Sequence, residues 1–209
     1  MRRGLFLTVE GVEGAGKTTC LASVRALLES RGERVVMTRE PGGTALGEAI
    51  RGLLLGHDYA GMSTEAETLL VFAARAEHLA KVVRPALEQG SVVVCDRFTD
   101  ATYAYQGGGR GLADSRIAQL EDWVQQGLQP DLTLLLDLPV DQGLARAGQR
   151  SAPDRFESEQ SAFFERARAC YRERAARYPE RIRVIDASVS VDEVRAQILA
   201  VLEQFYRER

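Results

Sequence analysis

The stretch "GLFLTVEGVEGAGKTT", residues 4–19, joins an apolar run to a glycine-rich turn that ends in lysine and threonine. Gly11, Gly16, Lys17 and Thr18 match the spacing G-x-x-x-x-G-K-[ST], which binds phosphate where it follows a strand and opens a helix. Glycines permit positive φ and let successive backbone N–H groups point into one concavity. Of the 27 lysines and arginines only Lys17 and Lys81 are lysines, so a lysine kept in this turn favours a chemical role.

We expect this loop to bind the polyphosphate of a nucleoside triphosphate. The helix that follows adds unpaired N–H groups and a positive dipole end. The compact charge of Lys17 suits the β- and γ-phosphates, and the Thr18 hydroxyl can ligate Mg²⁺. The alternative, a glycine-rich turn with a surface lysine, is disfavoured because motif and context agree. The expected binding residues are Gly11, Val12, Glu13, Gly14, Ala15, Gly16, Lys17, Thr18 and Thr19.

Short apolar runs alternate with longer helical patterns along the whole chain. Such alternation predicts an α/β protein of three layers, a P-loop NTPase fold whose five-stranded parallel sheet has helices on both faces. Capping boxes at 64–67 and 190–193 predict two helix starts. We expect one domain over 1–209, with a lid at about 146–157. The predicted strands are 4–10, 33–40, 91–96, 132–138 and 181–187, and the predicted helices are 17–30, 45–55, 64–89, 114–126, 140–148, 158–178 and 190–207.

Composition excludes several classes of protein. The net charge is −3, so no global basic field would draw the chain to nucleic acid or to a membrane. The apolar run near the start is too short for a signal-peptide core or a spanning helix. Three widely spaced cysteines without a C-x-x-C motif suggest neither a disulfide framework nor a zinc site. We expect a cytoplasmic protein with small-molecule substrates.

A Mg²⁺ site beside a P-loop usually needs an acidic residue at the end of a neighbouring strand. Asp96 follows the run "VVVC", and Arg97 beside it could hold a second phosphate. An exposed Asp–Arg pair at a strand end is the alternative. Asp137 also follows an apolar run, but a helix cap for 140–148 is the favoured interpretation there.

Features in the rest of the chain indicate which class of P-loop protein this is. It contains no asparagine, so the guanine-reading motif N-K-x-D is excluded. A small kinase that moves a phosphoryl group between two bound nucleotides needs mobile arginines and a closing lid. The polar segment 146–155 supplies Arg146, Arg150 and Arg155. A solvated basic loop without a function is the alternative.

Several blocks together resemble bacterial thymidylate kinases, in the family's order and over nearly the whole chain. They are "GVEGAGKTT" (11–19), "TREPGGT" (38–44), "FAARAEH" (72–78), "DRFTDATYAYQGGGRG" (96–111), "PDLTLLLDLP" (130–139) and "DRFE" (154–157). The resemblance implies transfer of the ATP γ-phosphate to dTMP, with Mg²⁺, in a homodimer whose contact includes the helix 64–89. The chain also resembles the bacterial subtype of this family, in which the lid supplies the catalytic arginine.

Roles for individual residues follow from that resemblance. Phe72 would stack on the thymine, Arg75 would donate to a pyrimidine carbonyl, and Thr102 would bond the base. Tyr105 would exclude a ribose 2′-hydroxyl, and Gln106 would lie near the sugar or the phosphate. Arg97 and Arg39 would bind the acceptor phosphate, and Glu13 and Glu40 would lie beside the acceptor nucleotide. Arg155 is the first candidate for contact with the transferring group, and Arg150 is the second. Arg146 with residues 186–188 would contact adenine, and Thr18 with Asp96 would bind the metal.

Two other hypotheses remain open from the sequence. One is a related kinase that acts on a different nucleoside or nucleoside monophosphate. The other is a nucleotide-dependent switch or binding protein without an acceptor substrate. The arginine-bearing flap argues against a switch, which needs no second phosphate clamp.

Overall fold

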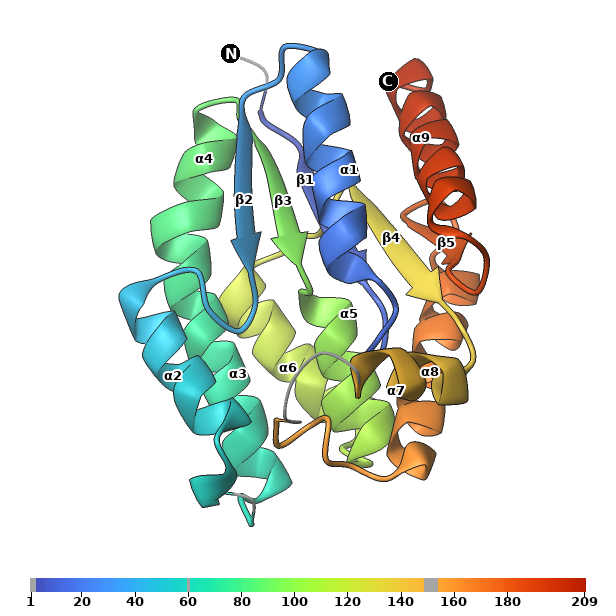
Figure 1. Ribbon diagram of the computed structural model, residues 1–209. Helices are drawn as coiled ribbons and strands as arrows, with labels where there is room; N and C mark the ends of the chain where they lie inside the picture. Colours follow the sequence, from blue (N-terminus) through green and yellow to red (C-terminus); the bar gives the residue numbers. More distant parts are fainter. Residues whose placement is uncertain (1–2, 60, 149–153) are drawn as a thin grey trace.

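Five parallel strands form one sheet in the order β2-β3-β1-β4-β5 (Figure 1). The structure, a computed structural model, describes residues 3–59, 61–148 and 154–209. The strands are β1 (Phe6–Glu10), β2 (Val35–Arg39), β3 (Val92–Asp96), β4 (Leu132–Asp137) and β5 (Ile182–Asp186). The predicted fold class is confirmed, and each strand lies within two residues of its predicted bounds.

The central strand β1 places the functional loops side by side. It pairs in parallel with β3, where Val9 lies opposite Asp96, and with β4, where Glu10 lies opposite Leu135. Because the carboxyl ends of parallel strands meet at one edge of the sheet, the loop after β1 lies against the turn after β3. The glycine-rich loop and the pair Asp96–Arg97 therefore share one crevice.

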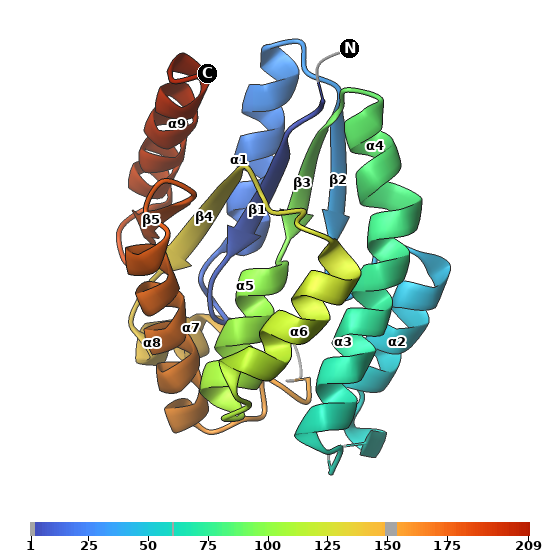
Figure 2. The same cartoon turned by 180° about the vertical axis from the view of Figure 1, so that it is seen from behind.

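Helices cover both faces of the sheet (Figures 1 and 2). The α1 and α9 helices lie on one face, where Val24, Leu28 and Ile198 join the core. The continuous helix α3–η2–α4 lies on the other. The helices are α1 (Lys17–Ser30), α2 (Ala45–Leu55), η1 (His57–Tyr59), α3 (Thr64–His78), η2 (Leu79–Val83), α4 (Arg84–Glu88), α5 (Thr99–Thr102), η3 (Tyr103–Gly109), α6 (Asp114–Gln125), α7 (Val140–Ala147), α8 (Ser161–Arg177) and α9 (Val191–Arg207).

The long predicted helix 64–89 runs from Thr64 to Glu88 with one irregularity. Proline has no N–H, and its ring clashes with the carbonyl four residues earlier. A π-helical turn, Leu79–Val83, precedes Pro85 and accommodates it, so the proline does not end the helix.

One of the two predicted capping boxes is confirmed and the other is wrong. Ser190 accepts from the Glu193 backbone N–H, and the Glu193 carboxylate accepts from the Ser190 backbone N–H, as predicted. At α3 the cap is Ser63, which accepts from the Ala66 N–H, so Thr64 is the first helical residue. A serine one position earlier reaches the free N–H groups without entering the helix. The N-cap of α7 is Pro139 and not Asp137, whose carboxylate binds Arg168 (2.7 Å).

The helical segment 99–109 is absent from the prediction, because "QGGGRG" is typical of a loop. Tertiary packing overrides that local preference. A Cβ on Gly108 would meet the Arg166 backbone, and one on Gly109 would meet the Phe163 ring. The glycines therefore let η3 lie directly against α8, which brings Tyr105 and Gln106 to the crevice.

Candidate active site

The turn between β1 and α1 has the geometry of a phosphate-binding loop. Gly11, Gly14 and Gly16 have φ of 142°, 73° and 87°. At Gly14 a Cβ would collide with the backbone of Gly143, whereas at Gly16 it would meet nothing within 4 Å. Gly16 is the N-cap of α1 and brings no side chain to cover the helix N-terminus. The loop therefore presents backbone N–H groups and the positive end of the helix to the crevice.

Lys17 folds back over this loop. Its Nζ donates to the carbonyl oxygens of Gly11 (3.1 Å) and Val12 (3.2 Å), and the residue is only 9% exposed. Burial, together with the charge of Arg97, lowers the pKa of Lys17, while Glu13 and Asp96 act in the opposite direction. A bound polyphosphate would offer this ammonium stronger acceptors than two neutral carbonyls.

Arg97 faces the loop from the end of β3. Its Nη2 donates to Glu13 Oε1 (2.6 Å) and to the Tyr105 hydroxyl (2.8 Å), and that hydroxyl also donates to Glu13 (3.1 Å). Burial acts to raise the pKa of Glu13, but the charges of Arg97 and Lys17 outweigh it and hold the pKa at about 2. Glu13 is thus an anion between two cations, a place that a phosphate could take over.

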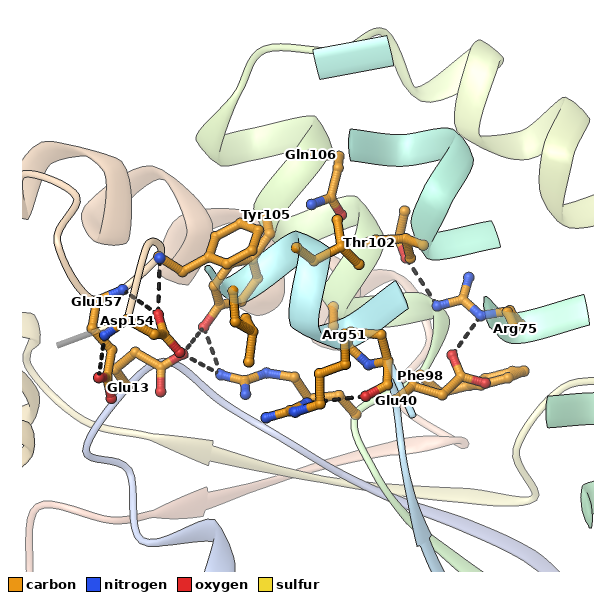
Figure 3. A pocket seen from close by; sticks show the side chains of 17 residues that line it. Glu13, Glu40, Arg51, Arg75, Phe98, Thr102, Tyr105, Gln106, Asp154 and Glu157 are labelled. Atoms are coloured by element: carbon orange, nitrogen blue, oxygen red, sulfur yellow. Dashed lines mark hydrogen bonds and ion pairs between the residues drawn. The ribbon is translucent and has the colours of Figure 1, made fainter. Parts of the chain in front are cut away.

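A cavity of about 190 Å³ opens beside this cluster (Figure 3). It joins the crevice edge of the sheet to α2, α3, η3 and the segment after residue 153. Acidic, basic and apolar side chains line it together. The lining residues are Glu13, Glu40, Pro41, Arg51, Leu54, Leu55, Val71, Arg75, Arg97, Phe98, Ala101, Thr102, Tyr105, Gln106, Asp154, Phe156 and Glu157.

Arg75 lines the cavity and is only 1% exposed. Its Nε donates to Glu40 Oε2 (2.7 Å), and its Nη2 donates to the Thr102 hydroxyl (3.0 Å). Among the described residues, its buried Nη1 has no hydrogen-bond partner. Glu40 also lies 2.8 Å from Nδ1 of His78, to which the sequence assigned no role. An unpaired guanidinium nitrogen in a cavity wall is a ready donor for a ligand oxygen.

Phe72 does not line this cavity, but its ring lies against the Arg75 guanidinium, 4.8 Å from the ring centroid. Its stacking on a base stays a prediction. Phe72 packs with Tyr103 and Ile117 on the side of α3 that faces α6. Residues four apart share a helix face, so Val71 lines the cavity together with Arg75. Phe98 supplies an aromatic ring there instead.

Arg39 does not line this cavity, and its predicted contact with the acceptor phosphate stays a prediction. It is half exposed, and its guanidinium binds the carboxylate of Glu48 (2.8 Å) on α2. Arg51, one turn further along α2, lines the cavity and donates to the Pro41 carbonyl (3.0 Å). Sequence reasoning missed Arg51, although its place four residues before Leu55 on an amphipathic helix could have indicated an inward face.

Arg155 is bound to the Leu54 carbonyl and to Glu67, and its contact with the transferring group stays a prediction. Its Nε donates to the Leu54 carbonyl (2.7 Å) and its Nη2 to Glu67 (2.6 Å), and it is 5% exposed. A buried guanidinium needs such partners, and Glu67 supplies the charge. The other predicted lid arginine, Arg150, lies outside the described residues.

Asp96 offers an oxygen suited to a divalent cation. In the part of the chain that the structure describes, its buried Oδ1 has no hydrogen-bond partner. Thr18 is exposed in the first turn of α1, at the other side of the crevice. Mg²⁺ usually takes one or two protein oxygens and completes its shell with phosphate oxygens and water. The residues present therefore fit the metal site predicted from Thr18 and Asp96.

A second cavity, of about 460 Å³, lies on the far side of the glycine-rich loop. Gly14, Gly16 and Thr19 line it together with Arg146 and the segment 187–191. Arg146 donates to the Ala187 carbonyl (2.9 Å). The predicted neighbourhood of Arg146 and residues 186–188 thus exists, next to the loop.

Known proteins resemble this chain over nearly its full length. The family profile described as "Thymidylate kinase" matches residues 9–198. A thymidylate kinase of Alkalilimnicola ehrlichii is 60% identical over 195 residues, 93% of this chain and 90% of that protein. One of Nitrosomonas europaea is 54% identical over 208 residues, covering 100% and 96%.

A solved structure agrees with the sequence comparisons. The crystal structure of a thymidylate kinase from Ehrlichia chaffeensis superposes with a TM-score of 0.79 at 34% identity, covering 96% of this chain and 99% of that one. Within residues 3–59, 61–148 and 154–209, no helix combines the length and apolar character that spanning a membrane requires.

Proposed function

The chain belongs to the thymidylate kinase family, and from that premise we propose that it transfers the γ-phosphoryl group of ATP to dTMP. The observation that carries the proposal is the position of Arg97. It lies between a phosphate-binding loop and a cavity lined by Arg75, whose buried Nη1 has no hydrogen-bond partner among the residues that the structure describes. Two anionic ligands that must approach within bonding distance need such a shared cation.

The acceptor phosphate lies against Arg97 and Arg51 in this proposal. Both line the cavity. Glu13 releases Arg97 when the phosphate arrives, because a dianion offers the guanidinium two oxygens in place of one. The freed Glu13 carboxylate then faces the sugar hydroxyls, and the Tyr105 ring beside it limits space at the 2′ position.

The pyrimidine occupies the inner end of the cavity. Arg75 Nη1 donates to a ring carbonyl, and Thr102 and Gln106 complete the polar wall. The apolar surfaces of Phe98 and Val71 contact the ring faces. Buried polar groups that require partners give strong discrimination between bases.

ATP binds with its phosphates in the loop 11–18 and its adenine towards Arg146 in the second cavity. The Thr18 hydroxyl and Asp96 would hold Mg²⁺, which would neutralise phosphate charge during transfer. Lys17 orients the same oxygens. The acceptor oxygen is already anionic, so the chemistry requires no general base.

We also propose that the chain is one domain with a lid at about 146–157. Asp154, Phe156 and Glu157 line the acceptor cavity, so movement of this segment would open or close it. Arg155 reaches the transferring group only by leaving Glu67, which the arrival of a stronger anion would favour.

The test compares dTMP with dUMP, UMP, dCMP and dGMP as acceptors, by ATP-dependent ADP release. The proposal predicts turnover with dTMP far above that with UMP, dCMP or dGMP. Preference for any of those three would favour a kinase of different base specificity. Slow ATP hydrolysis that no monophosphate stimulates would favour a switch or binding protein.

We propose the cytoplasm as the location of the protein, because its three free cysteines, Cys20, Cys95 and Cys170, suit a reducing compartment.

A homodimer is the proposed assembly. An apolar groove between α3 and α6 is rimmed by Leu69, 55% exposed, and Trp123, 75% exposed. Exposed apolar surface of this kind marks a contact. Light scattering should report a dimer that Trp123→Glu dissociates and Val184→Glu leaves intact; a monomeric wild type would contradict it.

A further inference from the structure

Glu67 is a buried carboxylate that accepts hydrogen bonds from three side chains. It lies in the first turn of α3 and is 1% exposed. It accepts from Gln106 Nε2 of η3 (2.9 Å), from Arg155 Nη2 (2.6 Å) and from Arg110 Nη2 (3.3 Å). The proposed chemistry uses Arg155 and Gln106 but leaves Glu67 without a role.

The contact with Gln106 fixes which way that amide points. An ion-paired carboxylate only accepts hydrogen bonds, so Gln106 must turn its NH₂ group towards Glu67. Its Oε1 then faces the other way. Gln106 is 3% exposed and lines the acceptor cavity beside Thr102 (Figure 3). The cavity wall therefore presents an amide acceptor, and without Glu67 the amide could rotate and present a donor.

The opposite donor is Arg75. Arg75 lines the same cavity as Gln106, and its buried Nη1 has no partner within the described chain. A donor beside an acceptor matches the carbonyl and the N3–H of a pyrimidine-2,4-dione. Cytosine offers the reverse, an amino group beside an N3 acceptor. A buried polar wall that must be satisfied rejects the mismatched base.

We propose that Glu67 is a positioning residue for base specificity, which holds the Gln106 amide as an acceptor and so favours thymine over cytosine. This rests on the proposed function, because it requires a pyrimidine monophosphate in the cavity. Glu67 touches no substrate in this account and acts only through Gln106. Its ion pairs with Arg155 and Arg110 keep the carboxylate in place.

The test measures kcat and KM for dTMP and for dCMP. Glu67→Gln can donate as well as accept, so it allows both orientations of Gln106. The ratio of kcat/KM for dTMP to that for dCMP should fall about tenfold, the value of one hydrogen bond, mainly through the two KM values. An unchanged ratio would overturn the proposal. Glu67→Asp keeps the charge but shortens the reach, and should shift the ratio in the same direction if Glu67→Gln does not fold.

A double-mutant cycle separates positioning from a general structural effect. In a Gln106→Met background, Glu67→Gln should change the ratio by less than about twofold. An equal change in both backgrounds would show that Glu67 does not act through Gln106. Arg155→Met removes one strong contact of Glu67 but leaves Arg110 and Gln106 on the carboxylate, so it should lower the ratio less than Glu67→Gln does, whatever it does to turnover. A loss of discrimination in Arg155→Met as large as that in Glu67→Gln would overturn the proposal.

The wild-type enzyme separates this inference from the proposed function. If the wild type does not prefer dTMP to dCMP, the proposed function fails. If it does and the Glu67 variants keep that preference, only the role of Glu67 fails.

Discussion

Arg97 adopts a backbone conformation that few residues other than glycine accept, with φ of 68°. Neighbouring groups hold it there. The Arg97 N–H donates to the Val9 carbonyl (3.0 Å), and the Phe98 N–H donates to the buried carboxyl of Glu10 (2.7 Å). Burial, with the nearby charge of Asp100, raises the pKa of Glu10 to about 8. Strain of this kind collects at functional sites, and here it turns the guanidinium back towards the phosphate-binding loop.

Two arginines on or near α2 give a matched pair of variants. Arg51→Ala should raise KM for dTMP roughly 10- to 100-fold, because it removes a charged hydrogen bond to the acceptor phosphate. Arg39→Ala should change KM less than about twofold, since its side chain is half exposed and held by Glu48. Steady-state kinetics at varied dTMP checks both. A larger rise in KM for Arg39→Ala than for Arg51→Ala would instead support the predicted contact of Arg39 with the acceptor phosphate.

Glu13 should make stability depend on pH in acid. Its pKa is about 2 in the folded protein against an ordinary 4.5, so the folded state favours the anion. That stabilisation is complete above pH 4.5 and is lost as pH falls towards 2. It amounts to roughly 3 kcal/mol. Glu13→Gln should flatten the fall in urea unfolding free energy between pH 4.5 and 3, and equal slopes for both proteins would contradict the ion pair.

Much of the site could be predicted from the sequence at the level of the residue, but helix phase could not. The glycine-rich loop and Arg97 lie together because each follows the end of a parallel strand. Phe72 and Val71 differ by one position, or about 100° around α3, and only packing against α6 decides which faces the cavity. The choice between Arg39 and Arg51 likewise depends on the side chain of Glu48.

At the scale of elements, η3 and α8 show how packing can override local preference. The sequence from Tyr103 to Gly109 ends in three glycines, which weaken a helix by about 1 kcal/mol each relative to alanine. Close approach to α8 compensates, since Gly108 and Gly109 leave no Cβ in the interface. A sequence reading that weighs only local propensity therefore misses this helix, and with it the position of Tyr105.

Gly109→Ala tests that compensation. The new Cβ would overlap the Phe163 ring, so we expect a loss of roughly 1–3 kcal/mol in unfolding free energy. Gly52→Ala in α2 is the control, because its Cβ would meet nothing within 4 Å, and it should gain about 0.5–1 kcal/mol. Urea denaturation of both variants gives the comparison. Equal gains would show that η3 does not depend on the close contact.

For the whole molecule, the strand order decides how two nucleotides meet. Placing β1 between β3 and β4 sets the glycine-rich loop between the acceptor cavity on one side and the Arg146 cavity on the other. The alternation of apolar runs and helical patterns predicted this sheet, because buried parallel strands are continuously apolar. The pairs that complete the cavity, such as Glu67 with Arg155, join residues far apart in sequence and leave no local pattern.

The most direct test is a crystal structure with a non-hydrolysable ATP analogue and dTMP bound together. The account predicts the polyphosphate in the loop from Gly11 to Thr18, and the dTMP phosphate on Arg97 with Glu13 displaced. The thymine should contact Arg75 in the cavity of Figure 3. A polyphosphate bound elsewhere, with the loop 11–18 empty, would contradict the central claim.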